Sequence, residues 1–313
     1  EISECLVGSE MCIRDRWRKE NREVHKFLRA IGFSDITKKD LEMILDEVIT
    51  RPEIMKITKD SEGNEFAELS GSFAANAGIT VRGTYQEDDS FHMDYYYPYV
   101  FGTSITTNEQ IDVEKHAEKE SYAGVCDEVN LGVTLIFYIQ NVADYLAETN
   151  RHLSKIHYGA MLAGLSTEGK ILCPVVERKK NDVPAIQKND RHNQLIAQAR
   201  EGDEDAIESL TLEDMDTYAL LSQRVMKEDI FSIVKSTFMP FGIESDQYTV
   251  LGEIIDCVTM ENKLTHEKLY GMKLLCNNIQ FDVCINEKDL LGEPAIGRRF
   301  RGNVWMQGNL CLE

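Results

Sequence analysis

The sequence lacks the short motifs that identify most enzyme classes. It has no G-x-G-x-x-G turn, no complete G-x-x-x-x-G-K-S/T phosphate loop and no G-x-S-x-G turn around a nucleophilic serine. It also has no C-x-x-C pair, and no cysteine lies near a histidine at zinc-finger spacing. We therefore expect no catalytic residues, no metal and no other cofactor, and we favour a function that is not enzymatic.

Long apolar runs and basic residues are also scarce. The longest apolar run, residues 133–139, is far shorter than the roughly 18–20 residues that a membrane helix needs. The chain has 34 basic and 54 acidic residues, a net charge of -20. Phosphate backbones and anionic lipids attract clustered lysine and arginine, so this balance disfavours nucleic acid and membranes as partners. We expect a cytoplasmic protein.

Residues 1–16 have an origin outside any gene. The run LVGSEMCIRDR, residues 6–16, is the translation of a transposase adapter used in short-read DNA libraries. We therefore interpret residues 1–16 as a sequencing artefact, and residues 17–23 as an untranslated leader before a GTG start at Val24. Without the artefact the chain has 32 basic and 50 acidic residues, a net charge of -18, and six cysteines, which we expect to be reduced and mostly buried.

Residues 24–193 are predicted to form an α+β domain. Helices are expected at residues 27–31, ended by Gly32, and at 41–49, where Thr37 and Asp40 have capping-box spacing. Three antiparallel hairpins are expected at 54–58 with 65–69, 79–85 with 91–99, and 157–165 with 170–176. Between the hairpins we predict a solvated helix or loop at 102–130, a strand at 133–139 and a helix capped by Asn141, and after them a linker at 177–193.

The hairpin at residues 79–99 carries most of the candidate site. A five-residue loop pairs Tyr85 with Phe91, which places Arg82 directly opposite Asp94 on the outer face. Period-two alternation sends Phe91, Met93, Tyr95, Tyr97 and Tyr99 to the core face and leaves Tyr96 exposed.

The rest of the chain divides into a central helical segment, residues 194–245, and a small C-terminal β-barrel, residues 246–313. Four strand candidates, residues 248–255, 269–276, 279–285 and 300–306, lie within the last part of the chain. This density suits an OB-like barrel, with an SH3-like barrel or a simple meander as alternatives. The predicted fold class is therefore α+β.

Several motifs resemble one family of uncharacterised clostridial proteins, domain-of-unknown-function family 3881. The motifs are HKFLRAIGF (25–33), GVTLIFY (132–138), AREGD (199–203) with SLTLEDM (209–215), FMP (238–240) and WMQG (305–308). The resemblance runs from about Val24 to the C-terminus and implies a bacterial cytoplasmic protein without assigning catalytic residues. The resemblance implies that such proteins start with Met at the position of Val24, which supports the expected GTG start.

A metal-like group is the first candidate site. His92 and Asp94 lie two residues apart on one strand face, so both can reach one ion, and His116 is a possible third ligand. A cross-strand pair of Arg82 with Asp94 explains the hairpin without a metal. We therefore predict no metal and retain these four residues, with the exposed Tyr96 as a stacking surface, as ligand-binding candidates.

Arginines near the C-terminus are the second candidate site. Arg298, Arg299 and Arg301 flank Phe300 and would bind an oligonucleotide if the barrel is OB-like. A barrel rim with salt bridges to acidic neighbours is the alternative.

Three functions follow from these patterns. The favoured one is a non-catalytic binding or regulatory protein that acts through protein partners. Nucleic-acid binding by the C-terminal barrel is the second, and it needs a continuous basic or aromatic groove. A metal-dependent hydrolase is the third, and it needs His92, Asp94 and His116 to converge in one pocket.

Overall fold

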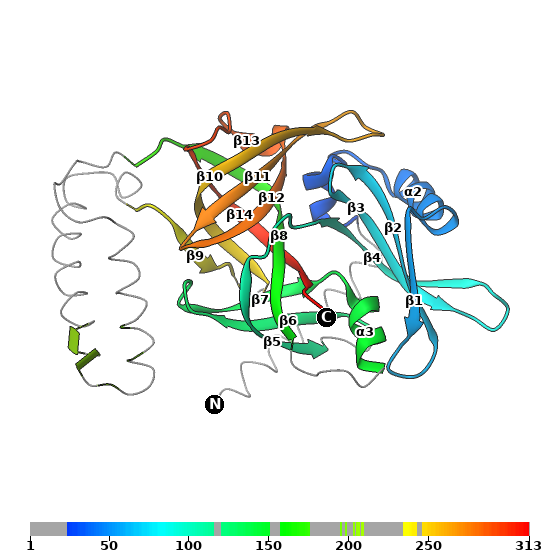
Figure 1. Cartoon of the computed structure of the whole chain (residues 1–313). Coiled ribbons are helices and arrows are strands. Elements are labelled where there is room, and N and C mark those ends of the chain that lie inside the picture. Colours follow the sequence, from blue (N-terminus) through cyan, green and yellow to red (C-terminus); the bar gives the residue numbers. More distant parts are fainter. Residues whose placement is uncertain are drawn as a thin grey trace. The chain divides into compact units, whose positions relative to one another are not determined.

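The computed structural model describes residues 24–115, 120–150, 157–175, 234–242 and 246–312, with isolated positions between 195 and 209 (Figure 1). The predicted artefact and leader, the 177–193 linker, His116 and most of the predicted 194–245 helical segment lie outside the described residues. Described residues up to Leu172 and from Ser236 onward form one compact unit, and Cys173–Lys235 form a second. The fold and sites described below belong to the first unit.

The predicted α+β class is wrong, because the structure is β-rich. The strongest departure is at residues 102–130, which we predicted to be a solvated helix or loop and which contain two strands. The predicted hairpin at 157–176 is also one continuous strand. Within the described residues, the helices are η1 (Lys26–Ile31), α2 (Lys38–Thr50), α3 (Val142–Asn150) and η2 (Glu287–Asp289).

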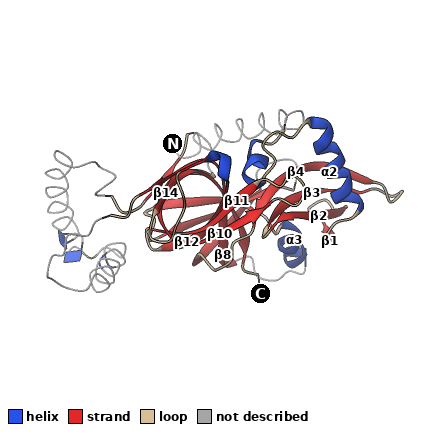
Figure 2. Cartoon of the chain, turned by 90° about the horizontal axis from the view of Figure 1, so that it is seen from above, coloured by secondary structure: helices blue, strands red, loops and turns tan. Residues whose placement is uncertain are grey.

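A four-stranded antiparallel sheet forms the first layer. Its order follows the sequence: β1 (Ile54–Lys59), β2 (Glu65–Ala74), β3 (Ala77–Tyr85) and β4 (Phe91–Val100). Helices α2 and α3 lie on opposite sides of this sheet (Figure 2). Both faces are therefore covered, which explains why β3 is buried almost throughout instead of alternating.

A second, larger sheet contains the remaining strands. Its order is β11-β12-β8-β5-β6-β7-β14-β10-β9, and β13 pairs with β8. The bounds are β5 (Thr107–Lys115), β6 (Tyr122–Glu128), β7 (Val133–Ile139), β8 (His157–Leu172), β9 (Thr237–Pro240), β10 (Gln247–Glu261), β11 (Lys268–Cys276), β12 (Ile279–Asn286), β13 (Leu290–Leu291) and β14 (Arg299–Leu310). Strand β9 replaces the end of the predicted helical segment.

Five strands of this sheet close into a ring. The pairs are β10 with β11, β11 with β12, β12 with β8, β8 with β14, and β14 with β10. Four of these strands come from residues 246–313, and the fifth, β8, precedes them by more than seventy positions in the sequence. Barrel closure therefore depends on residues 157–172, so the C-terminal strands do not close alone.

Local signals of the N-terminal segment are confirmed. Gly32 ends η1 with a φ of 94°, the left-handed conformation that glycine tolerates. Thr37 caps α2 by accepting from the Asp40 amide at 3.2 Å. The Asn277–Asn278 turn between β11 and β12 also has positive φ at both residues, as a tight hairpin turn requires.

Candidate functional site

A row of polar side chains crosses the four-stranded sheet. Lys56 on β1 pairs with Glu68 on β2, Glu68 with Arg82 on β3, and Arg82 with Tyr95 on β4. Residues directly opposite each other in antiparallel strands share one face. We call this row the charge ladder. The next row on the same face, Ile54, Ser70, Thr80 and Tyr97, has the same cross-strand alignment.

A β-bulge places Tyr95 opposite Arg82. The predicted pair of Tyr85 with Phe91 is confirmed, and beside it Thr84 faces His92 and Gly83 faces Met93. The register then shifts, so Arg82 faces Tyr95 and the predicted Arg82–Asp94 pair is wrong. Arg82 is 0% exposed instead of lying on an outer face, because β7 of the second sheet covers it.

The Arg82 guanidinium is held from two sheets. Its Nη1 donates to the hydroxyls of Tyr95 (3.0 Å) and Tyr138 (2.8 Å). Its Nη2 donates to the Tyr97 hydroxyl (3.1 Å) and to the backbone carbonyls of Ile139 (3.1 Å) and Gln140 (2.7 Å). Tyr138 and the two carbonyls belong to β7 and its end, so Arg82 joins the two sheets through a buried polar core.

Glu68 forms a buried ion pair with Arg82. Its Oε2 lies 3.3 Å from Arg82 Nη2. Burial alone lowers the pKa of Arg82. The interactions with Glu68 and then with the three tyrosines outweigh burial and raise the pKa well above its ordinary value. Burial raises the pKa of Glu68, and the Arg82 charge and the Ala143 amide offset this only in part.

Glu68 also caps a helix that is remote in sequence. The Ala143 N–H in the first turn of α3 donates to Glu68 Oε2 at 2.7 Å. A carboxylate is favourable there because the first amides of a helix lack partners within it. The predicted cap, Asn141, instead exchanges two hydrogen bonds with the backbone of Leu310 (2.9 and 3.0 Å), so its side chain anchors β14.

A pocket of about 320 Å³ opens over these two rows of the sheet. Its walls come from the four-stranded sheet, α3, β8 and β14, and an ion pair of Lys56 Nζ with Asp144 Oδ2 (2.6 Å) lies at its side. Its volume is at the small end of ligand sites, which are typically about 300–1,000 Å³. We call it the ladder pocket. Its polar lining includes Lys56, Glu68, Ser70, Thr80, Gln140 and Asp144, and its apolar lining includes Ile54, Phe101, Met161 and Leu310.

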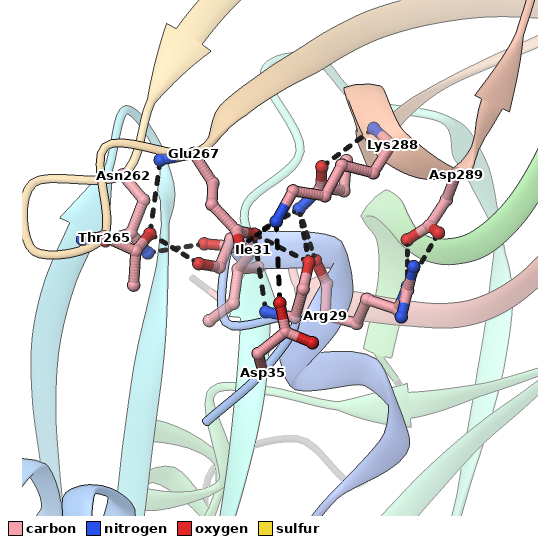
Figure 3. A network of polar contacts seen from close by, with 11 residues as sticks. Arg29, Ile31, Asp35, Asn262, Thr265, Glu267, Lys288 and Asp289 are labelled. Carbon is pink, nitrogen blue, oxygen red and sulfur yellow. Dashed lines mark hydrogen bonds and ion pairs between the residues drawn. The ribbon is translucent and has the colours of Figure 1, made fainter. Parts of the chain in front are cut away.

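A second polar network holds the N-terminal segment against the barrel (Figure 3). Four successive carbonyls at the end of η1, residues 29–32, each accept from one side chain of the barrel. The donors are Asn286 to Arg29 (3.2 Å), Cys284 to Ala30 (3.3 Å), Asn262 to Ile31 (2.7 Å) and Thr265 to Gly32 (2.6 Å). We call these four donors the carbonyl clasp. The last carbonyls of a helix lack partners within it, and here the carbonyl of Arg29 also accepts from the Gly32 amide at 3.1 Å.

Charged groups around the carbonyl clasp pair with one another. The Glu267 carboxylate accepts from Ser34 Oγ (2.7 Å), Asn286 Nδ2 (2.6 Å) and Lys288 Nζ (2.6 Å). Arg29 and Asp289 form a separate pair, drawn at the edge of the network in Figure 3. A pocket of about 250 Å³ lies beside Glu267. Glu267 already accepts the three hydrogen bonds given above, and Arg29 of η1 already pairs with Asp289. We therefore assign the network a structural role.

The predicted metal-like residues are only partly placed by the structure. His92 is exposed and Asp94 is half-buried on β4, while His116 lies outside the described residues. Among residues that the structure describes, no group of three or more His, Cys, Asp or Glu side chains could hold a metal ion. Tyr96 is half-buried, and its hydroxyl accepts from the His25 amide at 3.1 Å.

The three arginines of the second candidate site do not share one surface. Arg298 is exposed and donates to the Glu293 carbonyl at 2.6 Å, whereas Arg299 is 4% exposed. Arg301 is exposed, but Phe300 between them is fully buried in the barrel core. A stacking platform needs an accessible aromatic face, which Phe300 does not offer.

Residues 164–170 match the first seven positions of a phosphate loop, G-x-x-x-x-G-K, with Ile171 in place of the serine or threonine. They lie within β8 and pair with β14. Extended backbone does not make the cradle of amides that binds phosphate, so this match has no functional meaning.

Comparison with known proteins identifies the family. A family model described as "Domain of unknown function, E. rectale Gene description (DUF3881)" matches residues 28–308. The chain belongs to this family, which confirms the resemblance drawn from its motifs. No curated protein and no solved structure matches the chain.

Of the predicted site residues, only Arg82 belongs to the charge ladder. Glu68, Tyr138, Gln140 and Asp144 were missed because no motif links them. The one local signal was an arginine in an otherwise apolar strand, since a charge within a buried strand requires partners. In the part of the chain that the structure describes, no helix is both long and apolar enough to cross a bilayer.

Proposed function

We propose that the protein is a non-catalytic binding protein and that the ladder pocket holds its ligand, a small polar molecule. The observation that supports this is the construction of the pocket floor. Six side chains from the two aligned rows form it, and Arg82, which lies buried behind Glu68, is fixed by hydrogen bonds from two sheets. A floor built in this way is preorganised, which reduces the entropy lost on binding.

The state of the pocket carboxylates favours binding over catalysis. Glu68 already interacts with Arg82 and the Ala143 amide, and Asp144 already holds Lys56. A general base must reach the proton that it removes, which these contacts oppose. The same contacts present fixed charges and hydroxyls to a ligand, and Phe101 and Met161 supply apolar surface beside them.

A screen by ligand-observed NMR tests this proposal. The full chain would be mixed with amino acids, nucleosides, monosaccharides and small dicarboxylates. Ile54 and Met161 line the pocket, so Ile54→Trp or Met161→Trp should fill it and abolish binding. Met239→Trp, at an exposed position that does not line the ladder pocket, is the control and should leave binding unchanged.

The proposal fails if the wild-type chain binds no compound of the set, or if both pocket-filling variants bind as the wild type does. Ile54 is 44% exposed, so a tryptophan there extends into the pocket without disturbing the core. This variant therefore remains informative if Met161→Trp does not fold. A cytoplasmic location and protein partners stay predictions that are independent of this site.

A further inference from the structure

We propose that the ligand of the ladder pocket is a small zwitterion, a free amino acid with an apolar side chain, which binds by opening the Lys56–Asp144 ion pair. The inference rests on the proposed function and adds the chemical class of the ligand. It follows from the balance of charge in the pocket and from the unequal exposure of its two ion pairs.

The charges around the pocket sum to zero. Lys56, Glu68 and Asp144 line the pocket, and Arg82, which is fully buried, lies directly behind Glu68. Together they provide two positive and two negative charges. A ligand with a net charge would leave one charge uncompensated in a partly buried site, which is costly. A neutral molecule that carries one charge of each sign avoids this cost and can still form charge-assisted hydrogen bonds.

The two ion pairs differ in how easily they can be opened. Arg82 and Glu68 are 0% and 7% exposed in their side chains, whereas Lys56 and Asp144 are 40% and 43% exposed. Separating a buried pair costs about 3–5 kcal/mol, while an exposed pair contributes about 0–1 kcal/mol. The Lys56–Asp144 pair is therefore the one that a ligand can replace.

Replacement supplies a partner for each end of a zwitterion. The ligand carboxylate pairs with Lys56 Nζ, and the ligand ammonium pairs with Asp144. Both side chains line the pocket, and Lys56 also lies opposite Glu68 in the charge ladder. Ile54, Phe101, Met161 and Leu310 form the apolar part of the lining and would cover an aliphatic or thioether side chain.

Calorimetric titration of the full chain tests the charge requirement. L-Valine, L-leucine and L-methionine are the probes, and the one that binds is compared with its N-acetyl and carboxamide derivatives. Each derivative removes one charge, so its dissociation constant should rise about tenfold or more, as expected for the loss of one charge-assisted hydrogen bond. The proposal is overturned if none of the three amino acids binds, or if either derivative binds equally well.

A matched pair of variants tests the location. Lys56→Ala with Asp144→Ala should abolish binding of the amino acid. Lys268→Ala with Glu287→Ala is the control and should leave binding unchanged, because that pair has the same 2.6 Å separation and similar exposure, 43% and 48%, but does not line the pocket. Equal affinities of the two double variants would refute the assignment. If none of the three amino acids binds, but another compound binds the wild type and not Ile54→Trp, the zwitterionic ligand is wrong and the proposed function stands.

Discussion

The charge ladder and the carbonyl clasp use the same kinds of side chain for different purposes. The ladder, and the clasp together with the charged groups around it, combine basic residues, a glutamate and hydroxyl or amide groups, and both join segments that are far apart in sequence. In the ladder the arginine is fully buried and a pocket opens beside it. Around the clasp the basic side chains of Lys288 and Arg29 are 51% and 41% exposed, although their partners Glu267 and Asp289 are only 12% and 7% exposed. The clasp itself consists of uncharged side chains that donate to backbone carbonyls.

Burial decides what each network can do. An exposed ion pair is screened by water and salt, so it adds little stability and offers little to a ligand. A buried charge must keep its partners, so it fixes the geometry around it. The ladder can therefore form the rigid wall of a binding site, whereas the clasp holds a short helix in place.

The largest expected effect is the loss of Arg82. Arg82→Met should lower the free energy of unfolding by about 3–5 kcal/mol, because Glu68 and three tyrosine hydroxyls lose their partner inside the protein. Arg29→Met is the comparison in the clasp. Arg29 is 41% exposed in its side chain, but its partner Asp289 is only 7% exposed, so this variant should lose about 1–3 kcal/mol, less than Arg82→Met. Chemical denaturation measures both, and equal losses would remove the distinction between the two networks.

Gly32→Ala should have the next largest effect. A β-carbon at Gly32 would lie 2.7 Å from Cβ of Asn262, and the φ of 94° is unfavourable for alanine. Gly63→Ala is a matched control, because Gly63 has the same φ but no atom within 4 Å of the added carbon. The strain alone should cost about 1 kcal/mol at both sites, and Gly32→Ala should lose measurably more in thermal denaturation. An equal or larger loss of stability in Gly63→Ala would contradict the close contact between Gly32 and Asn262 of the clasp.

The smallest expected effects are opposite responses to pH. Burial raises the pKa of Glu68, so the folded state binds this proton more tightly, and the stability gained at low pH is lost as pH rises above about 4.3 towards the raised pKa. Burial acts in the same direction on Glu267, but Lys288, Ser34 and Asn286 lower its pKa overall. Its contribution is therefore complete above about pH 4.3 and lost as pH falls through the lowered pKa.

Gln variants at these two positions isolate the two contributions. The free energy of unfolding of the wild type minus that of Glu68→Gln should decrease as pH rises. The corresponding difference for Glu267→Gln should increase as pH rises. Urea denaturation at a series of pH values measures both differences. Slopes of the same sign would contradict the opposite environments assigned to the two carboxylates.

Much of the local structure could be predicted from the sequence, because its causes are local. The Thr37 cap, the Gly32 stop and the first pair of the 79–99 hairpin depend on neighbouring residues alone. Strand β5 was missed because polar and acidic residues at its exposed positions hide the alternation, and β6 was missed because it is buried almost throughout and shows little alternation. The continuity of β8 was missed because Gly169, which suggests a turn, instead makes room for Phe300 of β14.

The site itself depends on contacts that no local pattern contains. The bulge at Asp94 places Tyr95 opposite Arg82, and Arg82 Nη1 donates to both Tyr95 and Tyr138, which lies on another sheet. The cap of α3 comes from Glu68, 75 residues away, so the nearby Asn141 seemed the obvious candidate. A predicted Arg82–Asp94 pair and a predicted Asn141 cap were both reasonable locally, and both were overridden by packing between the sheets.

An amide chemical-shift map of the full chain titrated with L-valine, L-leucine and L-methionine tests the central claim most directly. If the ladder pocket is the binding site, the shifts should change at β1, β2 and the first turn of α3, around Lys56, Glu68 and Asp144. The amides of the carbonyl clasp should remain unchanged. Changes centred on Asn262 and Glu267, or on Arg298 to Arg301, would contradict the account.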